Sequence, residues 1–276
     1  MKGKVAIVTG SSMGIGKAIA RDLGSAGARI VLNGRTLSRL ESTRDELRAE
    51  GIEAIAVASD VSSWEGAQAL AEAALAHYGQ IDILINNAGA STRGSIEATA
   101  PEVFQNLLNV NVLGTIFPTK AALPHLRARR GSVILISSLA GIHGLPFNAI
   151  YSSTKMALTA LSQSLRVEEP DLHVGIAYVG FTENDPKKEI FDADGQRIYL
   201  EKREGIRKQS PEQVAAIIRR MIERRQKSRV LSVPGHFLAL FNRIAPGLVS
   251  FLYTRNRASI KANSEGAPRY VKSAQG

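Results

Sequence analysis

Short apolar runs rich in valine and isoleucine alternate along the chain with longer stretches in which apolar residues recur every three or four positions. A short run is typical of a strand buried on both faces, and the longer period is typical of a helix packed on such a sheet. This alternation predicts an α/β fold, a doubly wound sheet of about seven parallel strands with helices on both faces. Strands are predicted at 4–9, 29–33, 53–58, 81–86, 131–137, 172–178 and 229–233. Helices are predicted at 14–26, 37–50 and 64–78 and from Pro211 onward.

The length of the chain suits one large core. It has 276 residues, of which 44% are hydrophobic, and a chain of this size buries about three quarters of its unfolded surface. We expect a dinucleotide-binding catalytic domain over 1–235 and a basic, apolar extension over 236–276. The absence of cysteine excludes disulfides, a thiolate nucleophile and cysteine-bound zinc. No signal peptide and no apolar run of membrane-spanning length is found, so we expect a cytoplasmic protein.

Positive charge is concentrated toward the C-terminal end. Residues 1–201 contain 19 Lys and Arg against 21 Asp and Glu, whereas residues 202–276 contain 16 against 4. Zinc-finger spacing and an arginine–aromatic pattern typical of RNA binding are absent from the sequence, so nucleic acid is not an expected partner. The five histidines are scattered without metal-binding spacing, and no metal site is predicted.

A glycine-rich turn, Thr9-Gly10-Ser11-Ser12-Met13-Gly14-Ile15-Gly16, joins the first strand to its helix. Gly10 would permit the tight turn, and Gly14 and Gly16 would let a pyrophosphate approach the helix N-terminus, where free N–H groups and the helix dipole favour anions. Asp60-Val61 and Asn86-Asn87-Ala88-Gly89 follow later strands. Ligands of open α/β sheets bind at these carboxyl ends, although Asp, Asn and Gly are also ordinary turn residues.

The candidate chemistry lies in Tyr151-Ser152-Ser153-Thr154-Lys155. Residues four apart share one face of a helix, and an ammonium beside a phenol lowers the pKa of the phenol toward neutrality. Tyr151 would then exchange protons, with Lys155 tuning it. The spacing also occurs by chance on helix surfaces, so its meaning depends on other residues. Ser138 ends the fifth strand, and Asn111 falls in a helical pattern where a buried amide is costly unless it is used.

These motifs resemble the short-chain dehydrogenase/reductase family over about residues 4–235. The resemblance implies a Rossmann-like fold, a nicotinamide cofactor and a catalytic set of Asn, Ser, Tyr and Lys. Tyr151 would protonate a carbonyl oxygen or deprotonate an alcohol, and Ser138 would bind the same oxygen. Lys155 would depress the pKa of Tyr151 and bind the nicotinamide ribose, and Asn111 would hold a water that relays protons from Lys155.

The resemblance also implies cofactor contacts along the carboxyl edge of the sheet. They are expected from Gly10, Ser12, Met13, Gly14, Ile15, Gly16, Arg35, Asp60, Val61, Asn87, Ala88, Gly89, Tyr151, Lys155, Gly180 and Thr182. Val179 stands where the family usually has proline, which gives this turn an additional backbone N–H.

The end of the second strand bears on the choice of cofactor. An acidic residue there would bind a ribose 2′-OH and repel a 2′-phosphate, but the chain has Asn33-Gly34-Arg35. A guanidinium pairs well with phosphate, so NADP(H) is predicted over NAD(H). Met13 argues the other way, because many NADP-dependent members of the family resembled carry a second basic residue at that position.

The leading interpretation is an NADP(H)-dependent oxidoreductase that acts on a carbonyl or secondary alcohol of a hydrophobic substrate. A 3-ketoacyl thioester reductase is the alternative within enzymes, and a non-catalytic cofactor-binding sensor or scaffold is the alternative outside them. Substrate contacts are expected from Ser138, Tyr151 and His143. The polar segment from Glu183 to Glu204 is expected to form a mobile lid.

Two further regions have more apolar residues than one core face absorbs. The helices near 102–121 and 150–168 carry Leu107, Val112, Ile116, Leu158, Leu161 and Leu165, and we expect a homodimer or homotetramer. In the extension, apolar clusters at 237–241 and 248–253 lie beside several basic residues. These clusters fit a substrate lid or subunit contact, which is the commoner use of such residues, or a peripheral membrane contact.

Overall fold

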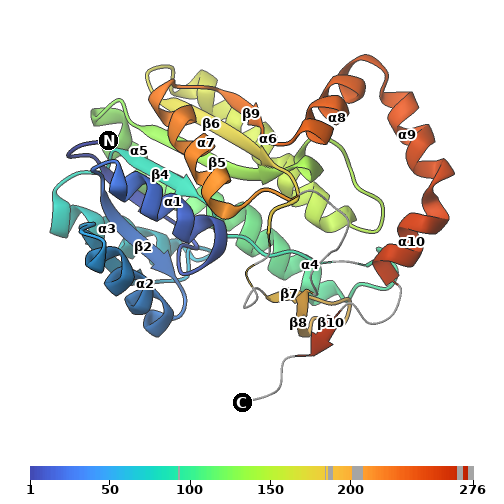
Figure 1. The fold of residues 1–276 in the computed structure, drawn as a ribbon, viewed down its shortest axis with the longest axis horizontal. Helices are drawn as coiled ribbons and strands as arrows, with labels where there is room; N and C mark the ends of the chain where they lie inside the picture. The colour runs from blue at the N-terminus through green and yellow to red at the C-terminus, as the bar shows by residue number, and fades with distance from the viewer. Residues whose placement is uncertain (93, 184, 186–188, 201–207, 266–269, 273–276) are drawn as a thin grey trace.

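Seven parallel strands form the central sheet, in the order β3-β2-β1-β4-β5-β6-β9 (Figure 1). This computed structural model describes residues 1–92, 94–183, 185, 189–200, 208–265 and 270–272. The strands are β1 Val5–Val8, β2 Arg29–Gly34, β3 Ala54–Ala58, β4 Ile83–Asn86, β5 Ser132–Ser138, β6 His173–Val179 and β9 Ser228–Val230. The predicted Rossmann-like α/β fold is confirmed.

Helices cover both faces of the sheet. They are α1 Gly14–Ser25, α2 Leu37–Ala49, α3 Trp64–Tyr78, α4 Pro101–Leu108, α5 Gly114–Ala128, α6 Ala149–Glu168 and α7 Pro211–Glu223. Neighbouring strand residues point to opposite faces, so Ile30 and Leu32 join one apolar layer and Val31 joins the other. The first layer includes residues of α1, α2 and α7, and the second includes residues of α3, α5 and α6. Burial on both faces explains why the strands read as unbroken apolar runs.

The strand order reverses at β1, which pairs with β2 on one side and with β4 on the other. Side chains join the carboxyl ends of β1 and β4 at this point. The Thr9 hydroxyl oxygen accepts the backbone N–H groups of Asn87 and Ala88, each at 3.0 Å. The Asn87 amide donates to the carbonyl oxygens of Thr9 and Gly10, at 3.0 and 2.9 Å. Ligands of open α/β sheets bind at such a reversal, so these contacts shape the expected cofactor site.

A second, antiparallel sheet was not predicted. It consists of β7 Glu189–Phe191, β8 Arg197–Leu200 and β10 Tyr270–Lys272. We predicted a mobile lid over residues 183–204, but its described part contains this hairpin, in which Ile190 and Ile198 are buried. The backbone of Phe191 bonds to Ser91 at 3.0 Å, which holds the hairpin against the segment after β4. The hairpin was not predicted because the segment as a whole is polar, and its two buried isoleucines do not form a recognisable strand pattern.

The chain beyond β9 forms three helices, α8 Val233–Ile244, α9 Pro246–Arg255 and α10 Arg257–Glu265, which extend away from the sheet (Figure 1). β10 then pairs with β8. Among the described residues no single helix has the length and apolar composition to span a membrane, although α8 and α9, bent by 120° at their junction, pass that test as a pair.

Half of the apolar residues that were expected to pair subunits are used inside this chain. Leu107, Leu158 and Leu165 are buried in its own core. Val112, Ile116 and Leu161 are partly exposed. The apolar surplus on these helices is therefore smaller than the sequence pattern indicated.

Candidate active site

Strand β5 and helix α6 bring Ser138 and Tyr151 together. Ser138 is the last residue of β5, and Tyr151 lies in the first turn of α6, close enough to Ser138 for that hydroxyl to lower its pKa. The Ser137 hydroxyl donates to the Lys155 carbonyl at 3.1 Å, which holds α6 against the strand end. A Cβ on Gly141 would lie 2.7 Å from that same carbonyl oxygen, so only glycine fits this close approach.

The phenol of Tyr151 is held in its protonated form. Burial raises the pKa of Tyr151 above its ordinary value, and the neighbouring Ser138 hydroxyl lowers it by a smaller amount. We predicted that Lys155 would lower this pKa, and the net direction is the opposite. The Lys155 Nζ lies 5.8 Å from the centre of the Tyr151 ring and donates to the Ile136 carbonyl at 3.0 Å. Desolvation of the phenol therefore sets the direction of the shift.

Asn111 lies in a π-helical turn, η1 Asn109–Leu113, between α4 and α5. Its amide is fully buried and makes hydrogen bonds, as expected for a buried asparagine side chain. The Oδ1 atom accepts the Ala90 N–H at 2.7 Å, and Nδ2 donates to the Ala90 carbonyl and the Thr154 hydroxyl, both at 3.0 Å. A Cβ on Gly89 would lie 3.1 Å from Asn111 Oδ1 and 3.6 Å from Lys155 Nζ. Asn111 and Lys155 therefore meet beside the segment that follows β4.

The glycines of the glycine-rich turn lie at positions where a side chain would be strained or would clash. Gly10 and Gly14 have φ of +62° and +55°, which L-residues with side chains rarely adopt. A Cβ on Gly16 would lie 2.3 Å from the Gly10 carbonyl oxygen and 2.4 Å from Asn87 Nδ2. Met13 is the N-cap of α1 and provides no side-chain cap. Backbone N–H groups at this helix terminus therefore remain suited to an anion.

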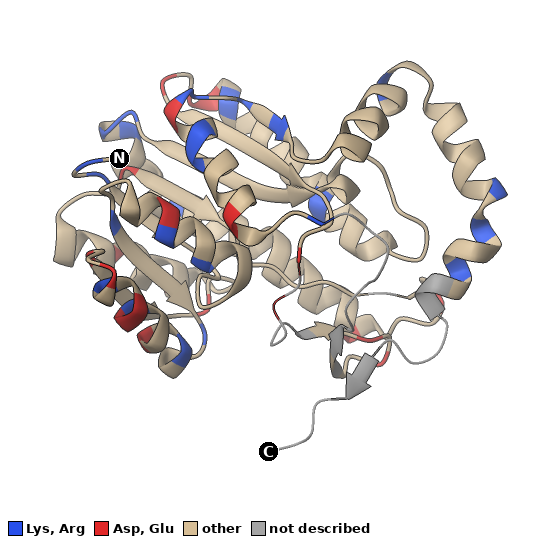
Figure 2. Ribbon diagram, viewed as in Figure 1, with Lys and Arg blue, Asp and Glu red and all other residues tan. Residues whose placement is uncertain are grey.

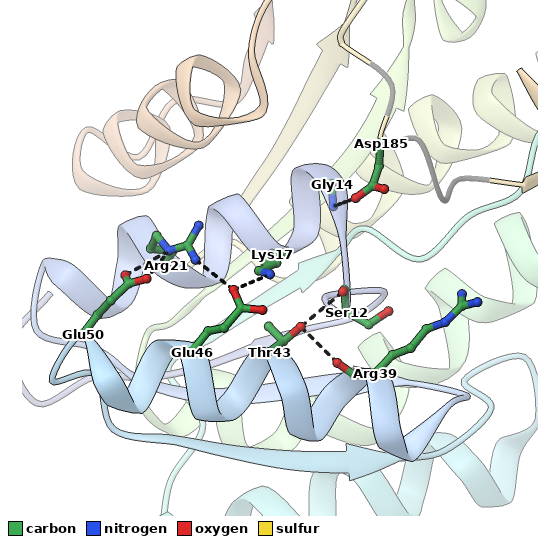
Figure 3. Close-up of polar contacts among 9 residues, drawn as sticks. All are labelled: Ser12, Gly14, Lys17, Arg21, Arg39, Thr43, Glu46, Glu50 and Asp185. Carbon is green, nitrogen blue, oxygen red and sulfur yellow. Dashed lines mark hydrogen bonds and ion pairs between the residues drawn. The ribbon is translucent and has the colours of Figure 1, made fainter. Parts of the chain in front are cut away.

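Asp185, which the sequence reasoning missed, occupies part of this anion site. Its Oδ2 accepts the Gly14 N–H at 3.3 Å (Figure 3). A cavity of about 300 Å³ opens here, and its lining includes Lys17, Arg21, Glu183 and Asp185. Lys17 and Arg21 are paired with Glu46 of α2, and Arg21 also with Glu50 at the C-terminal end of that helix. No local pattern could have identified Asp185, because it lies 171 positions from Gly14.

The end of β2 offers a basic surface without a carboxylate. Asn33 is buried, and its amide donates to Val57 and Ser59, so it serves the packing of β3. Arg35 is exposed just beyond it. Arg39, also exposed, lies beside the glycine-rich turn, because the Thr43 hydroxyl is hydrogen-bonded to the carbonyls of both Ser12 and Arg39 (Figure 3).

The remaining predicted cofactor residues lie along the same edge. Asp60 is exposed, and its Oδ1 accepts the N–H and the hydroxyl of Ser62, at 2.9 and 2.6 Å. Val61 is buried after β3, and Ile15 packs against the apolar layer beside α1. Gly180 follows β6, where a Cβ would lie 2.6 Å from Ser232 Oγ.

Two buried acceptors near Gly180 have no hydrogen-bond partner: Thr182 Oγ1 and Gln209 Oε1. The two residues are bridged to each other across a short parallel pairing. Unpaired buried polar atoms are rare in folded proteins, and a water, an ion or a bound polar group commonly accounts for them. Together with the uncapped N-terminus of α1 and the glycines around it, they fit a dinucleotide that lies from Gly14 to Thr182.

His143 borders the predicted substrate side, but the C-terminal helices hold its ring. The His143 Nδ1 lies 2.8 Å from Asn242 Oδ1, and the imidazole stacks on Tyr253 with ring centres 5.4 Å apart. The predicted substrate residue thus connects the segment after Ser138 to α8 and α9. Among the described residues no cluster of three or more His, Asp or Glu is arranged to hold a metal ion.

Comparison with known proteins gives a consistent result. The sequence model of the family described as short chain dehydrogenase matches residues 4–194. A dehydrogenase/reductase SDR family member 7B from Bos taurus is 35% identical over 258 residues, which cover 90% of this chain and 79% of the relative. An 11-beta-hydroxysteroid dehydrogenase-like 2 from Arabidopsis thaliana is 35% identical over 199 residues, 70% of this chain and 65% of the relative.

Solved structures agree in fold. An alcohol dehydrogenase from the archaeon Thermococcus sibiricus, complexed with 5-hydroxy-NADP, superposes with a TM-score of 0.70 at 26% identity and covers 82% of this chain and 95% of its own. A metagenomic short-chain oxidoreductase in complex with NADP gives a TM-score of 0.68 at 30% identity, with 83% and 97% covered.

Proposed function

The chain belongs to the short-chain dehydrogenase family and is an NAD(P)-dependent oxidoreductase, and from this premise we propose that it reduces the carbonyl of a hydrophobic substrate with NADP(H). The observation that carries the proposal is the placement of Ser138, the last residue of β5, close enough to the Tyr151 phenol to lower its pKa, with the buried Lys155 on the same helix as Tyr151. A cofactor-binding sensor or scaffold would have no chemical use for this arrangement.

Tyr151 carries the proton that the reduction of a carbonyl requires. Burial keeps the phenol protonated at neutral pH, so it can donate a proton to a carbonyl oxygen. The Ser138 hydroxyl would hold the same oxygen. Asn111 would fix the positions of Lys155 and of the η1 turn relative to Tyr151 and Ser138. A bound nicotinamide supplies or accepts the hydride.

Residues of the chain can hold the cofactor along one edge of the sheet. The N–H groups around Gly14 would bind the pyrophosphate, and the Thr182 hydroxyl and the side-chain amide oxygen of Gln209 would meet polar groups of the nicotinamide half. Asn87, Ala88 and Gly89 would border the ribose, with Asp60 and Val61 toward the adenine end. Each of these roles is inferred from position along the strand ends.

The proposed preference for NADP(H) rests on Arg35 and Arg39. Both are exposed near the end of β2, where a ribose 2′-phosphate would lie, and no carboxylate stands at Asn33 or Gly34. Arg39 supplies the second basic group that Met13 does not. Two of the solved structures to which the chain is similar contain NADP or a derivative of it.

The proposed substrate is hydrophobic because the segment between Ser138 and Tyr151 carries Ile142, Leu145 and Phe147, all partly exposed. One similar protein has a name that refers to a hydroxysteroid dehydrogenase. We also infer a homo-oligomer. Leu108 and Met156, 40% and 42% exposed, extend the partly exposed apolar set of α4, α5 and α6.

The proposed chemistry is tested with Tyr151→Phe, using NADPH and a panel of hydrophobic ketones, aldehydes and 3-ketoacyl thioesters. Loss of the hydroxyl should reduce turnover by about a hundredfold or more and leave NADPH affinity unchanged. Tyr178→Phe is the matched control, because its hydroxyl also lies near α6, 3.1 Å from Thr159 Oγ1. Wild-type turnover in Tyr151→Phe would exclude the assigned acid, and no turnover with any substrate in the wild type would favour the sensor.

A further inference from the structure

Helices α8 and α9 leave an unusual number of large apolar side chains in solvent. Of fourteen exposed large hydrophobic residues in the described chain, eight lie between residues 233 and 252. They are Val233, Phe237, Leu240, Phe241, Ile244, Leu248, Phe251 and Leu252, which are 40–70% exposed. Only Gly235 and Val249 of these two helices are buried. Contiguous exposure of this kind indicates a surface that is covered by a partner.

The charge of this arm, defined as residues 233–264, has one sign. It contains Arg243, Arg255, Arg257 and Lys261 and no Asp or Glu. Figure 2 shows basic positions along α8 and α9 without an acidic one. The acid-free stretch begins after Glu223, so residues 224–264 contain eight Lys and Arg and no acid. The arm is therefore complementary to an anionic surface.

The base of the arm is fixed to the substrate side of the active site. A Cβ on Gly235 would lie 2.5 Å from Leu139 Cδ2, so α8 packs directly on the residue after Ser138. The Asn242 amide donates to the Ile142 carbonyl at 2.9 Å, and Tyr253 stacks on His143. These contacts use the inner side of the arm and leave its phenylalanines outward.

We propose that the arm docks on the surface of an anionic lipid bilayer, with its apolar residues in the headgroup boundary and its arginines on lipid phosphates. Helices of 12 and 10 residues are about 18 and 15 Å long, too short for a hydrocarbon core of about 30 Å. Their 120° bend suits helices that lie along an interface. Docking would bring the site's entrance to the membrane, where a hydrophobic ketone is concentrated; this consequence rests on the proposed function, whereas the docking itself does not.

Charge distinguishes this partner from a second copy of the chain. A twofold contact between arms would bring two basic surfaces together without a carboxylate from either arm. A lid closed over the substrate would turn the phenylalanines toward the site, yet Phe237 and Phe251 are both 58% exposed. An anionic bilayer offers apolar surroundings for the exposed apolar residues and phosphates for the basic ones.

The test is co-sedimentation of the full chain with vesicles of phosphatidylcholine alone and of phosphatidylcholine with phosphatidylserine. We expect binding to the anionic vesicles that weakens with salt. Arg255→Gln with Arg257→Gln should reduce the partition constant about 25-fold, since each basic residue contributes about fivefold. Lys2→Gln with Lys4→Gln removes the same charge from the opposite end of the molecule and should have little effect (Figure 1).

The apolar half of the proposal has its own matched pair. Phe237→Ser with Phe251→Ser should abolish vesicle binding, whereas Val167→Ser with Ile96→Ser, at positions 82% and 68% exposed elsewhere, should not. Absence of anionic-vesicle binding in the wild type would overturn the proposal, as would equal losses in the control pairs. Light scattering that shows the phenylalanine variants dissociating an oligomer would assign the surface to a second copy instead. Tyr151→Phe should bind vesicles like the wild type, so a failure of the proposed chemistry would be seen separately.

Discussion

Replacing Asp185 with asparagine is predicted to tighten cofactor binding. In the structure the Asp185 carboxylate accepts the Gly14 N–H, one of the donors that a pyrophosphate would use (Figure 3). A negative charge at a helix N-terminus is favourable, so binding of the dinucleotide must first displace it. Asparagine keeps the acceptor oxygen and the shape of the side chain but removes the charge.

The size of the effect follows from the geometry of this contact. A hydrogen bond to a charged group is worth about 1.5–3 kcal/mol, but at 3.3 Å this bond is long and Asp185 is partly exposed. We therefore assign the lost charge about 1 kcal/mol, which corresponds to about fivefold in the dissociation constant. Because the pyrophosphate is common to both cofactors, NADPH and NADH should tighten by the same factor.

The assay is titration of each cofactor, followed by quenching of protein fluorescence or by calorimetry, at low and high salt. The gain should shrink at high salt, since screening weakens the competing carboxylate. Glu183→Gln is the control, because Glu183 borders the same cavity and carries the same charge, while its backbone N–H bonds to Gln209. Unchanged or weaker cofactor binding by Asp185→Asn would refute the idea that the Asp185 carboxylate competes with the pyrophosphate for the Gly14 N–H. An equal gain in affinity in Glu183→Gln would show that any loss of negative charge at this cavity has the same effect.

Three further predictions follow. Arg35→Ala should weaken NADPH by about ten- to a hundredfold and NADH little, because only the former has a 2′-phosphate; equal losses in cofactor titrations would make Arg35 structural. Lys155→Met should lower both turnover and cofactor affinity, and unchanged affinity would remove the ribose contact. Burial lowers the pKa of His173, so the unfolded state binds more protons at mildly acidic pH, and stability should be full above about pH 6.5 and fall below it by up to about 1.4 kcal/mol per pH unit. His173→Asn should flatten that slope in denaturant titrations, whereas an unchanged slope would assign the acid sensitivity to other groups.

The parallel sheet could be predicted from the sequence because its strands are buried on both faces. Each of the seven predicted ranges overlaps an observed strand. The antiparallel strands β7 and β8 escaped prediction because their apolar runs, Ile190-Phe191 and Ile198-Tyr199-Leu200, are very short and lie in an otherwise charged and polar segment. The π-helical turn at Asn111 could not be predicted, since its sequence continues the helical pattern of α4. In each case tertiary contacts, rather than local periodicity, determine the structure.

In the candidate site, too, local spacing could be predicted from the sequence and effects of tertiary packing could not. The spacing of Tyr151 and Lys155 located the helix and its face, but the sequence could not report which effect controls the phenol. Desolvation depends on everything that packs around a side chain, and here it sets the direction in which the pKa of Tyr151 shifts. The unpaired Thr182 hydroxyl lies where the sequence predicted a cofactor contact, whereas its neighbour Gln209 joins it only through a bridge between distant segments.

Two kinds of contact hold the two halves of the site, and this difference explains which part of the function the sequence reveals. The cofactor half depends on glycines that cannot carry a side chain and on the hydrogen bonds that join Thr9 to Asn87. Few residue types are tolerated at such positions, so they form a motif that can be recognised in the sequence. The proposed substrate half depends on contacts of Leu139 with Gly235, Asn242 with Ile142 and Tyr253 with His143, each pair about a hundred positions apart in the chain. Many residue combinations could make those contacts, and on this proposal specificity would depend on how the arm meets residues 139–147 rather than on a local pattern.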